Sequence, residues 1–308
     1  MSTNKFKREK KTNKKKLYKK STMVIIWVSI LLIIGIISKY IYDINTKAKS
    51  PLLKTVKVHI YTLDEVSYYF VKCIVRDTRN VYIKNSTILN TSKLNTNKVE
   101  YAYSTKIVIV FFKTNSNLQF TQNQKNNITI LDLGKSLYNN KDYNEYAYLS
   151  PKAAARMLFD IANTLGHIDL SHIENFLNRY YQCEKILIDA HYKLGLTIAR
   201  LNKEKNKKIV TLLPYYKQLE IDYPLKFKSL YNSREEFLEK KVIKIEPNEI
   251  LLLTREEEKN LYKNVSGYKI YIIPDIPYLV QKGVKSDDIA VQCVTENVEL
   301  LDKIAKNH

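Results

Sequence analysis

The side chains in this sequence with the strongest tendency to bind a transition metal are its three cysteines and five histidines. Cys73, Cys183 and Cys293 lie far apart in the chain and are odd in number, so their spacing fits neither a zinc knuckle nor a disulfide framework. Each lies in an apolar pattern that is typical of a helix. We therefore predict that all three are buried thiols.

The histidines do not form a recognisable set of ligands. His167 and His172 are five residues apart, a spacing that does not place two side chains on one face of a helix, so surface or helix-capping roles are expected. His191 lies in the middle of a long helical pattern, where a polar surface position is a simpler interpretation than metal ligation. His59 lies on a predicted strand, and its side chain could face either a cleft or a layer of helices.

Motifs of the common catalytic and nucleotide-binding classes are absent from the sequence. It contains no glycine-rich phosphate loop, no Ser, His and Asp in an order typical of hydrolases, and no metal-binding pair of histidines at helical spacing. The sequence therefore offers no candidate catalytic residues, and we predict that the protein is not an enzyme.

Two helices are predicted in the centre of the chain. The first begins at Ser150 and Pro151, because Ser is a favoured N-cap and Pro suits the first helical position, and Gly166 is expected to end it in a left-handed conformation. The second begins with a capping box from Ser171 to Glu174. Its apolar stripe repeats at seven-residue intervals: Ile173, Tyr180, Leu187, Leu194 and Leu201. One helix of about thirty residues, roughly 45 Å long, would form either a coiled coil or a spine between two lobes.

Strand-like and helical segments alternate on both sides of this long helix, which favours the spine. The predicted strands are Val56–Tyr61, Val81–Ile83, Ile107–Phe112, Ile128–Leu131, Ile209–Leu213, Ile250–Leu253 and Ile270–Ile273. The further predicted helices are Asp64–Arg76, Tyr215–Tyr223, Arg255–Val265 and Asp287–Ala305. Continuously apolar strands are covered on both faces, as in parallel sheets. The pattern predicts two α/β lobes, residues 51–168 and 208–308, joined by a linking helix within residues 169–207.

The N-terminal 42 residues differ from the rest. Residues 1–22 form a basic segment, in which residues 1–20 carry ten Lys and Arg against one Glu, so +9 of the net charge of +20 lies there. The other lysines are dispersed, and we expect no nucleic-acid partner. Residues 23–42 approach the ~20 apolar residues that cross a bilayer, and the basic flank predicts a transmembrane signal anchor with a cytoplasmic N-terminus. Removal as a cleaved signal peptide is the competing interpretation, although Thr46 to Ala48 is a poor cleavage site.

The segment Tyr146-Ala-Tyr-Leu-Ser-Pro-Lys-Ala153, followed by a helix, a short turn and a very long helix, resembles the solute-binding proteins of zinc and manganese ABC transporters. The resemblance extends over most of residues 55–305. Lys54 to Arg76 is similar to the first strand and helix of that family, Val210 to Leu225 to a later strand and helix, and Tyr271 to Pro277 to the strand that ends in an acidic metal ligand.

The resemblance places the four metal-ligand positions of the family on Asn90, Tyr146, Leu213 and Asp275. Only Asp275 could bind zinc or manganese as the family does. Leu213 offers no donor atom, Asn90 offers a neutral carbonyl, and Tyr146 offers a phenol whose ordinary pKa is near 10. Glu145 could take the place of Tyr146 by a shift of one residue. We therefore expect a degraded site, in which zinc or manganese binds weakly or not at all.

The resemblance implies an α/β fold of the two-lobe periplasmic metal-binding type, with a long helix linking the lobes, and a protein that delivers metal to a cognate ABC permease. Together with the transmembrane helix predicted from residues 23–42, it predicts a membrane-anchored protein whose bulk is periplasmic or on the cell surface. The alternative hypothesis is a non-metal interaction or surface-assembly module that reuses the two-lobe scaffold.

Overall fold

The computed structural model describes residues 56–76, 78–85, 105–112, 128–135, 137, 146–203, 208–240, 243–246, 249–255, 257, 269–284 and 287–306. All of them belong to one compact unit, Thr55–His308. The basic segment and the transmembrane segment predicted at residues 1–22 and 23–42 lie outside the described residues. Within the described ranges, no helix is both long enough and apolar enough to cross a membrane.

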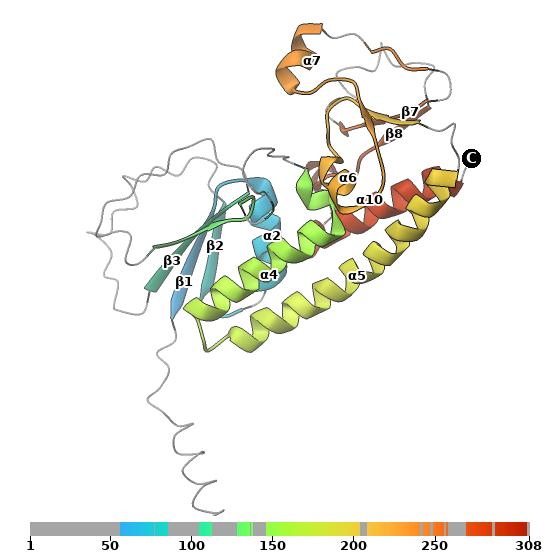
Figure 1. Cartoon of the computed structure of the whole chain (residues 1–308). Coiled ribbons are helices and arrows are strands. Elements are labelled where there is room, and N and C mark those ends of the chain that lie inside the picture. Colours follow the sequence, from blue (N-terminus) through green and yellow to red (C-terminus); the bar gives the residue numbers. More distant parts are fainter. Residues whose placement is uncertain are drawn as a thin grey trace, which may run out of the picture. The chain divides into compact units, whose positions relative to one another are not determined.

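The first sheet contains four parallel strands in the order β2-β1-β3-β4. The strands are β1 (Lys57–Thr62), β2 (Val81–Asn85), β3 (Thr105–Phe111) and β4 (Ile128–Asp132). Helix α2 (Glu65–Val75) connects β1 to β2 and lies beside the sheet (Figure 1). Asp64 caps this helix and also joins it to the sheet, because its Oδ1 accepts a bond from the Ser67 N–H and its Oδ2 from the Phe112 N–H, both at 2.7 Å.

The second sheet also contains four parallel strands, in the order β6-β5-β7-β8. The strands are β5 (Lys208–Thr211), β6 (Lys228–Ser229), β7 (Glu249–Leu253) and β8 (Lys269–Ile272). Three short helices accompany them: α6 (Lys217–Asp222), α7 (Arg234–Lys240) and α9 (Ile276–Gln281). β6, α7 and α9 are not predicted from the sequence, because their apolar patterns are too short to be recognised. The helix predicted at Arg255–Val265 lies almost wholly outside the described residues.

Three long helices pack together beside these sheets (Figure 1). They are α4 (Pro151–Ile168), the 31-residue α5 (Ile173–Lys203) and α10 (Ile289–Lys306), and the short 3₁₀ turn η2 (Ala147–Leu149) leads into α4. The predicted stripe on α5 is confirmed, since Tyr180, Leu187, Leu194 and Leu201 are buried. The prediction of one long continuous helix is therefore confirmed, and α4 and α10 cover its apolar stripe.

The turn between α4 and α5 differs from the prediction in two ways. Gly166 does not end α4, because the helix continues to Ile168, and a Cβ at Gly166 would lie 2.9 Å from Ile173 Cγ1. Glycine is needed here for the close approach of two helices. In addition, α5 begins at Ile173, and the Ser171 hydroxyl donates to the buried Asp169, 2.5 Å away, in the turn before the helix.

Ser150 occupies the N-cap position of α4 but does not cap the helix with its side chain. Its hydroxyl instead donates to Asp222, at the end of α6. The sequence signal of Ser followed by Pro located the helix start correctly, while the hydroxyl serves a contact between distant parts of the chain.

Candidate solute site at the strand ends of the second sheet

Three polar side chains follow the carboxyl ends of three neighbouring strands in the second sheet. Tyr215 follows β5, Glu257 follows β7, and Asp275 follows β8. Because the carboxyl ends of parallel strands lie at one edge of a sheet, these side chains are brought to the same edge. Open α/β sheets bind their ligands at this edge, so it is the first place to look for a site.

Asp275 is held firmly in a buried position. Its side chain is 5% exposed and caps α9, with Oδ1 accepting a bond from the Tyr278 N–H at 2.8 Å. The preceding carbonyl, of Pro274, accepts bonds from Cys293 Sγ at 2.9 Å and Asn297 Nδ2 at 2.7 Å, both on α10. Helix α10 therefore fixes the backbone just before the carboxylate.

Glu257 is the second buried carboxyl group, 8% exposed. The Tyr215 hydroxyl donates to its Oε1, and the Thr254 N–H donates to its Oε2 at 2.8 Å. The Glu257 N–H donates in return to Thr254 Oγ1 at 3.3 Å, which completes the reciprocal bonds of a capping box. Burial raises the pKa of Glu257 to about 8, and the nearby charge of Asp275 adds to the rise. Glu257 is thus mostly protonated at neutral pH.

Aromatic rings surround these carboxyl groups. The Tyr146 and Tyr215 rings pack edge to face, with centroids 4.4 Å apart, and Tyr148 lies beyond Tyr146 with centroids 6.3 Å apart. Burial raises the pKa of Tyr148 and Tyr216 far above the usual range, and the charge of Asp275 contributes to both shifts. These phenols are neutral at physiological pH and do not act as anionic metal ligands, and the Tyr216 hydroxyl donates to Asn297 Oδ1 at 2.8 Å.

The structure brings together some of the residues predicted from the sequence. Tyr146 is joined to Glu257 through Tyr215, and Asp275 lies close enough to shift the pKa of Glu257. Leu213 packs its carbon side chain against two hydrophobic clusters, and its carbonyl accepts the Tyr215 N–H at 2.7 Å. Asn90 and Glu145 lie outside the described residues.

Three histidines have partners of their own away from these carboxyl groups. His191 Nδ1 lies 2.6 Å from the Tyr223 hydroxyl, and His172 Nδ1 lies 2.7 Å from Asp169 Oδ2 in the turn before α5. The His59 ring stacks on Tyr82 in the neighbouring strand, with centroids 5.1 Å apart. Burial lowers the pKa of His59, and Lys57 lowers it further. Each of the three thus has a hydrogen-bonding or stacking partner within the protein.

Glu257 is not among the site residues predicted from the sequence, although the sequence contains a signal for it. The spacing Thr254-x-x-Glu257 is the sequence pattern of a capping box, and it follows directly on the buried strand β7. The sequence analysis gives this stretch only as part of a helix predicted at Arg255–Val265. The position after a buried parallel strand was the better guide, because it points the carboxyl group at the strand-end edge of the sheet.

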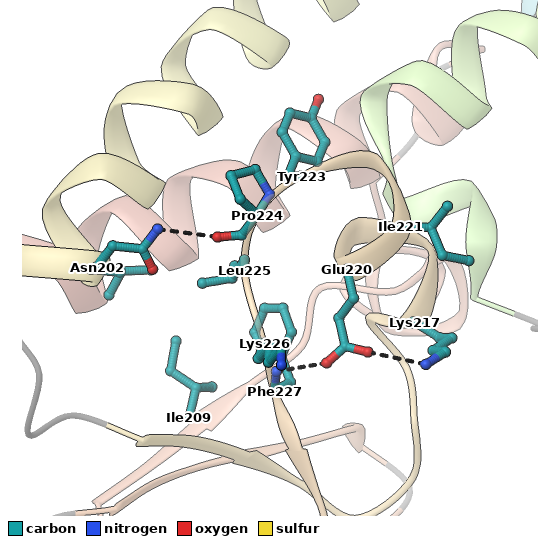
Figure 2. Close-up of a pocket in the computed structure, with 11 residues that line it drawn as sticks. Asn202, Ile209, Lys217, Glu220, Ile221, Tyr223, Pro224, Leu225, Lys226 and Phe227 are labelled. Carbon is teal, nitrogen blue, oxygen red and sulfur yellow. Dashed lines mark hydrogen bonds and ion pairs between the residues drawn. The ribbon is translucent and has the colours of Figure 1, made fainter.

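A separate pocket of about 790 Å³ lies at the opposite end of β5 (Figure 2). Lys217, Glu220 and Ile221 of α6 line it, with Asn202 at the end of α5 and Ile209 on β5. Its polar groups bond to one another: Glu220 accepts the Phe227 N–H at 2.7 Å and pairs with Lys217 at 3.5 Å (Figure 2). Because its one carboxylate, Glu220, is already paired with Lys217 and bonded to the Phe227 N–H, this pocket is a weaker candidate for a metal site than the strand ends.

No protein-family model and no curated protein matches this chain. Solved structures do match, with low sequence identity over most of the chain. The metal-dependent lipoprotein YcdH of Bacillus subtilis is 16% identical, with 80% of this chain and 98% of that chain covered and a TM-score of 0.51. The Zn(II)-bound ZnuA-like domain of AdcA from Streptococcus pneumoniae is 14% identical, with 80% and 98% covered and a TM-score of 0.52.

A third similar structure is the laminin-binding protein Lmb of Streptococcus agalactiae, described as a bifunctional protein with adhesin and metal-transporting activity. It is 13% identical, with 81% of this chain and 99% of that chain covered and a TM-score of 0.52. This chain has the fold of metal-binding solute-binding proteins. The resemblance inferred from the sequence is therefore confirmed at the level of the fold.

Proposed function

We propose that this protein is an extracytoplasmic solute-binding protein of the metal ABC-transporter type whose zinc or manganese site is degenerate. The hydrogen bond from Tyr215 to Glu257, packed against Tyr146, supports the proposal most directly. A metal carrier needs several ligand atoms that converge on one ion. At the strand ends of the second sheet, the polar side chains bond to one another instead. The role is binding, not catalysis.

The energetics favour this internally bonded arrangement over zinc binding. A zinc ion at Glu257 would have to remove a proton from a carboxyl group with a pKa of about 8 and share its oxygen atoms with the bonds from Tyr215 and Thr254. A hydrogen bond between neutral groups contributes about 0.5–1.5 kcal/mol to stability. Asp275 is the remaining carboxylate, and it already caps α9. An oxygen-only set also lacks the imidazoles that zinc favours.

Thermal unfolding of the chelator-treated full chain in detergent tests this proposal. A ligand at 100 times its Kd stabilises a fold by about 2.7 kcal/mol, so tight binding would raise the melting temperature clearly. If micromolar Zn²⁺ or Mn²⁺ raises the melting temperature at all, we expect the same rise in the wild type and in the variant that lacks the Asp275 carboxylate. The comparison is made with Asp275→Ala and, as a matched carboxyl control, Glu257→Gln. A rise that Asp275→Ala removes would contradict the degenerate site and support a working metal carrier.

The proposal also includes a membrane anchor and a permease partner. Residues 23–42 would anchor the protein after the basic segment at residues 1–22, and an ABC permease would be the partner. The bulk of the chain would then be extracytoplasmic, with lobes at residues 51–168 and 208–308 joined by residues 169–207. The intact mass of the membrane-extracted protein tests the anchor, since a mature N-terminus near Lys49 would indicate cleavage instead.

A second candidate function, a non-metal interaction module, is favoured by one surface feature. Tyr181, Ile188, Tyr192 and Leu196 are all exposed on α5, at spacings of seven and four residues that place them on one face of the helix. Cross-linking in cells compares the wild type with the double variant Tyr192→Lys and Leu196→Lys, and with Leu238→Lys on α7 as an exposed control. A cross-linked product lost only in the double variant would favour this candidate, and identical patterns would count against it.

A further inference from the structure

Two cysteines and an aspartate meet where three helices pack together. Cys73 lies on α2, Cys183 on α5, and Asp288 immediately before α10. The two Sγ atoms and a carboxylate oxygen all lie within 4.8 Å of one another. Among the residues that the structure describes, no other three His, Cys, Asp or Glu side chains bring their donor atoms so close together.

The two cysteines of the cluster are almost completely inaccessible to solvent. Cys73 and Cys183 are 0% and 1% exposed, while the Asp288 side chain is 35% exposed. Thiolates and a carboxylate are donor types that Zn²⁺ takes, at about 2.3 Å for sulfur and 2.0–2.2 Å for oxygen. Two sulfur atoms at that distance from one tetrahedral ion are about 3.8 Å apart. The three donors therefore need to move little to close around an ion.

Arg179 of α5 orients this cluster and can balance its charge. Its Nη2 donates to Asp288 Oδ1, and its Nε donates to the Cys73 carbonyl at 3.2 Å. Two thiolates, one carboxylate and one divalent ion carry a net charge of −1, which the guanidinium cancels. Burial of charge is costly unless it is paired, so this neutral assembly is the one that a dry site tolerates. A carboxylate has lone pairs enough to bond to Arg179 and to a metal at the same time.

We propose that Cys73, Cys183 and Asp288 bind one zinc-class metal ion that joins α2, α5 and the start of α10. Water would supply the fourth ligand from the exposed side of Asp288, since three protein ligands leave one tetrahedral position open. The mixed sulfur and carboxylate donors favour Zn²⁺ over Cu⁺, which prefers softer ligands alone. The site is separate from the strand ends of the second sheet and does not depend on the function proposed above.

Cobalt(II) is the probe for this site, because thiolate ligation gives it a charge-transfer absorption that zinc lacks. The full chain is purified in detergent under reducing conditions, treated with a chelator and titrated with Co²⁺. We expect one equivalent to bind with a thiolate-to-cobalt band, and Zn²⁺ to displace it. The band should disappear in Cys73→Ser and in Cys183→Ser. It should remain in Cys293→Ser, a matched control at the third buried cysteine, and in Asp275→Ala.

Asp288→Asn gives a second readout in case the buried serine variants fold poorly, because this side chain is partly exposed. Loss of a residue that only orients a ligand costs about 10- to 100-fold in metal affinity, so loss of the ligand itself should lower cobalt affinity at least about tenfold. Absence of a thiolate band in the reduced protein, or unchanged affinity in Asp288→Asn, would overturn the proposal. So would a disulfide between Cys73 and Cys183 in protein isolated from zinc-supplied cells, detected by intact mass and thiol counting.

Discussion

Glu257 illustrates how the position of a single residue decides its chemistry. It belongs to a run of acidic residues that resembles a solvated helix start, yet the structure buries it and bonds both of its oxygens. Burial favours the neutral acid, and the charge of Asp275 acts in the same direction. The pKa of about 8 therefore results from the buried position of Glu257 just after β7 and from its proximity to Asp275.

The raised pKa of Glu257 predicts a specific pH dependence of stability. Its ordinary pKa is 4.5 and its folded-state pKa is about 8, so between these values the folded protein holds a proton that the unfolded chain has lost. Stability rises with pH only where the unfolded state binds more protons. The contribution of Glu257 is therefore present in full below about pH 4.5 and is lost as the pH rises toward 8, by at most about 1.4 kcal/mol per pH unit.

Urea unfolding of the wild type and of Glu257→Gln between pH 5 and 8 measures this contribution. The difference between the two proteins removes the effects of all other titrating groups. We expect the wild type to lose stability relative to the variant as the pH rises. Parallel curves would mean that Glu257 is ionised in the folded protein at neutral pH.

At the scale of helices, Gly166 and Gly195 have very different surroundings. Gly166 and Gly195 both lie inside helices, where alanine is ordinarily favoured by about 1 kcal/mol. At Gly166 a Cβ would lie 2.9 Å from Ile173 Cγ1 and 3.7 Å from its Cβ, an atom fixed to the backbone. At Gly195 a Cβ would meet nothing within 4 Å.

Alanine at the two positions should have opposite effects on stability. Gly195→Ala should raise the free energy of unfolding by about 0.5–1 kcal/mol through helix propensity alone. Gly166→Ala gains the same term but overpacks the turn, at a cost of about 1–3 kcal/mol, so a net loss is expected. In a chain that already carries Ile173→Ala, the clash is removed, so adding Gly166→Ala should raise the free energy of unfolding. Denaturant unfolding of Gly195→Ala, Gly166→Ala, Ile173→Ala and the double variant tests the argument, which fails if Gly166→Ala alone is stabilising.

The parts of the fold that the sequence predicted are those with long, uniform patterns. The seven apolar runs predicted as strands match the seven longer strands, and the heptad-spaced stripe on α5 is buried as expected. β6 was missed because Lys228 and Ser229 carry no apolar signal. Gly166 was misinterpreted because its role is to let Ile173 approach, and a contact between two elements leaves no mark in local composition.

The candidate site was predicted less well for a related reason. Asp275 was located through the resemblance of Tyr271 to Pro277 to a family motif, but Glu257 depends on a partner, Tyr215, that is 42 residues away. The cluster of Cys73, Cys183 and Asp288 depends on how three helices pack, and spacing in the sequence pointed away from it. Burial of the three cysteines, by contrast, follows from their apolar surroundings and is confirmed.

At the scale of the whole folded unit, one hydrophobic cluster connects the two sheets. It includes Val58 and Val108 of the first sheet, Leu252 of the second, and Leu187 and Leu194 of α5. A two-lobe protein with separate cores could lose one lobe while it kept the other. A continuous cluster with α5 at its centre instead predicts that both sheets depend on the same helix.

Leu187→Ala tests whether both sheets share this core. Leu187 is fully buried near the middle of α5, so its truncation should cost about 2–5 kcal/mol. If the described part of the chain unfolds as a unit, hydrogen exchange of the slowest amides in β3 and in β7 should accelerate by equal factors, because both report the same global opening. Ile188→Ala, an exposed neighbour on the same helix, serves as the control and should leave both unchanged. Acceleration in one sheet alone would mean that the chain has two independently stable lobes and that α5 belongs to one of them.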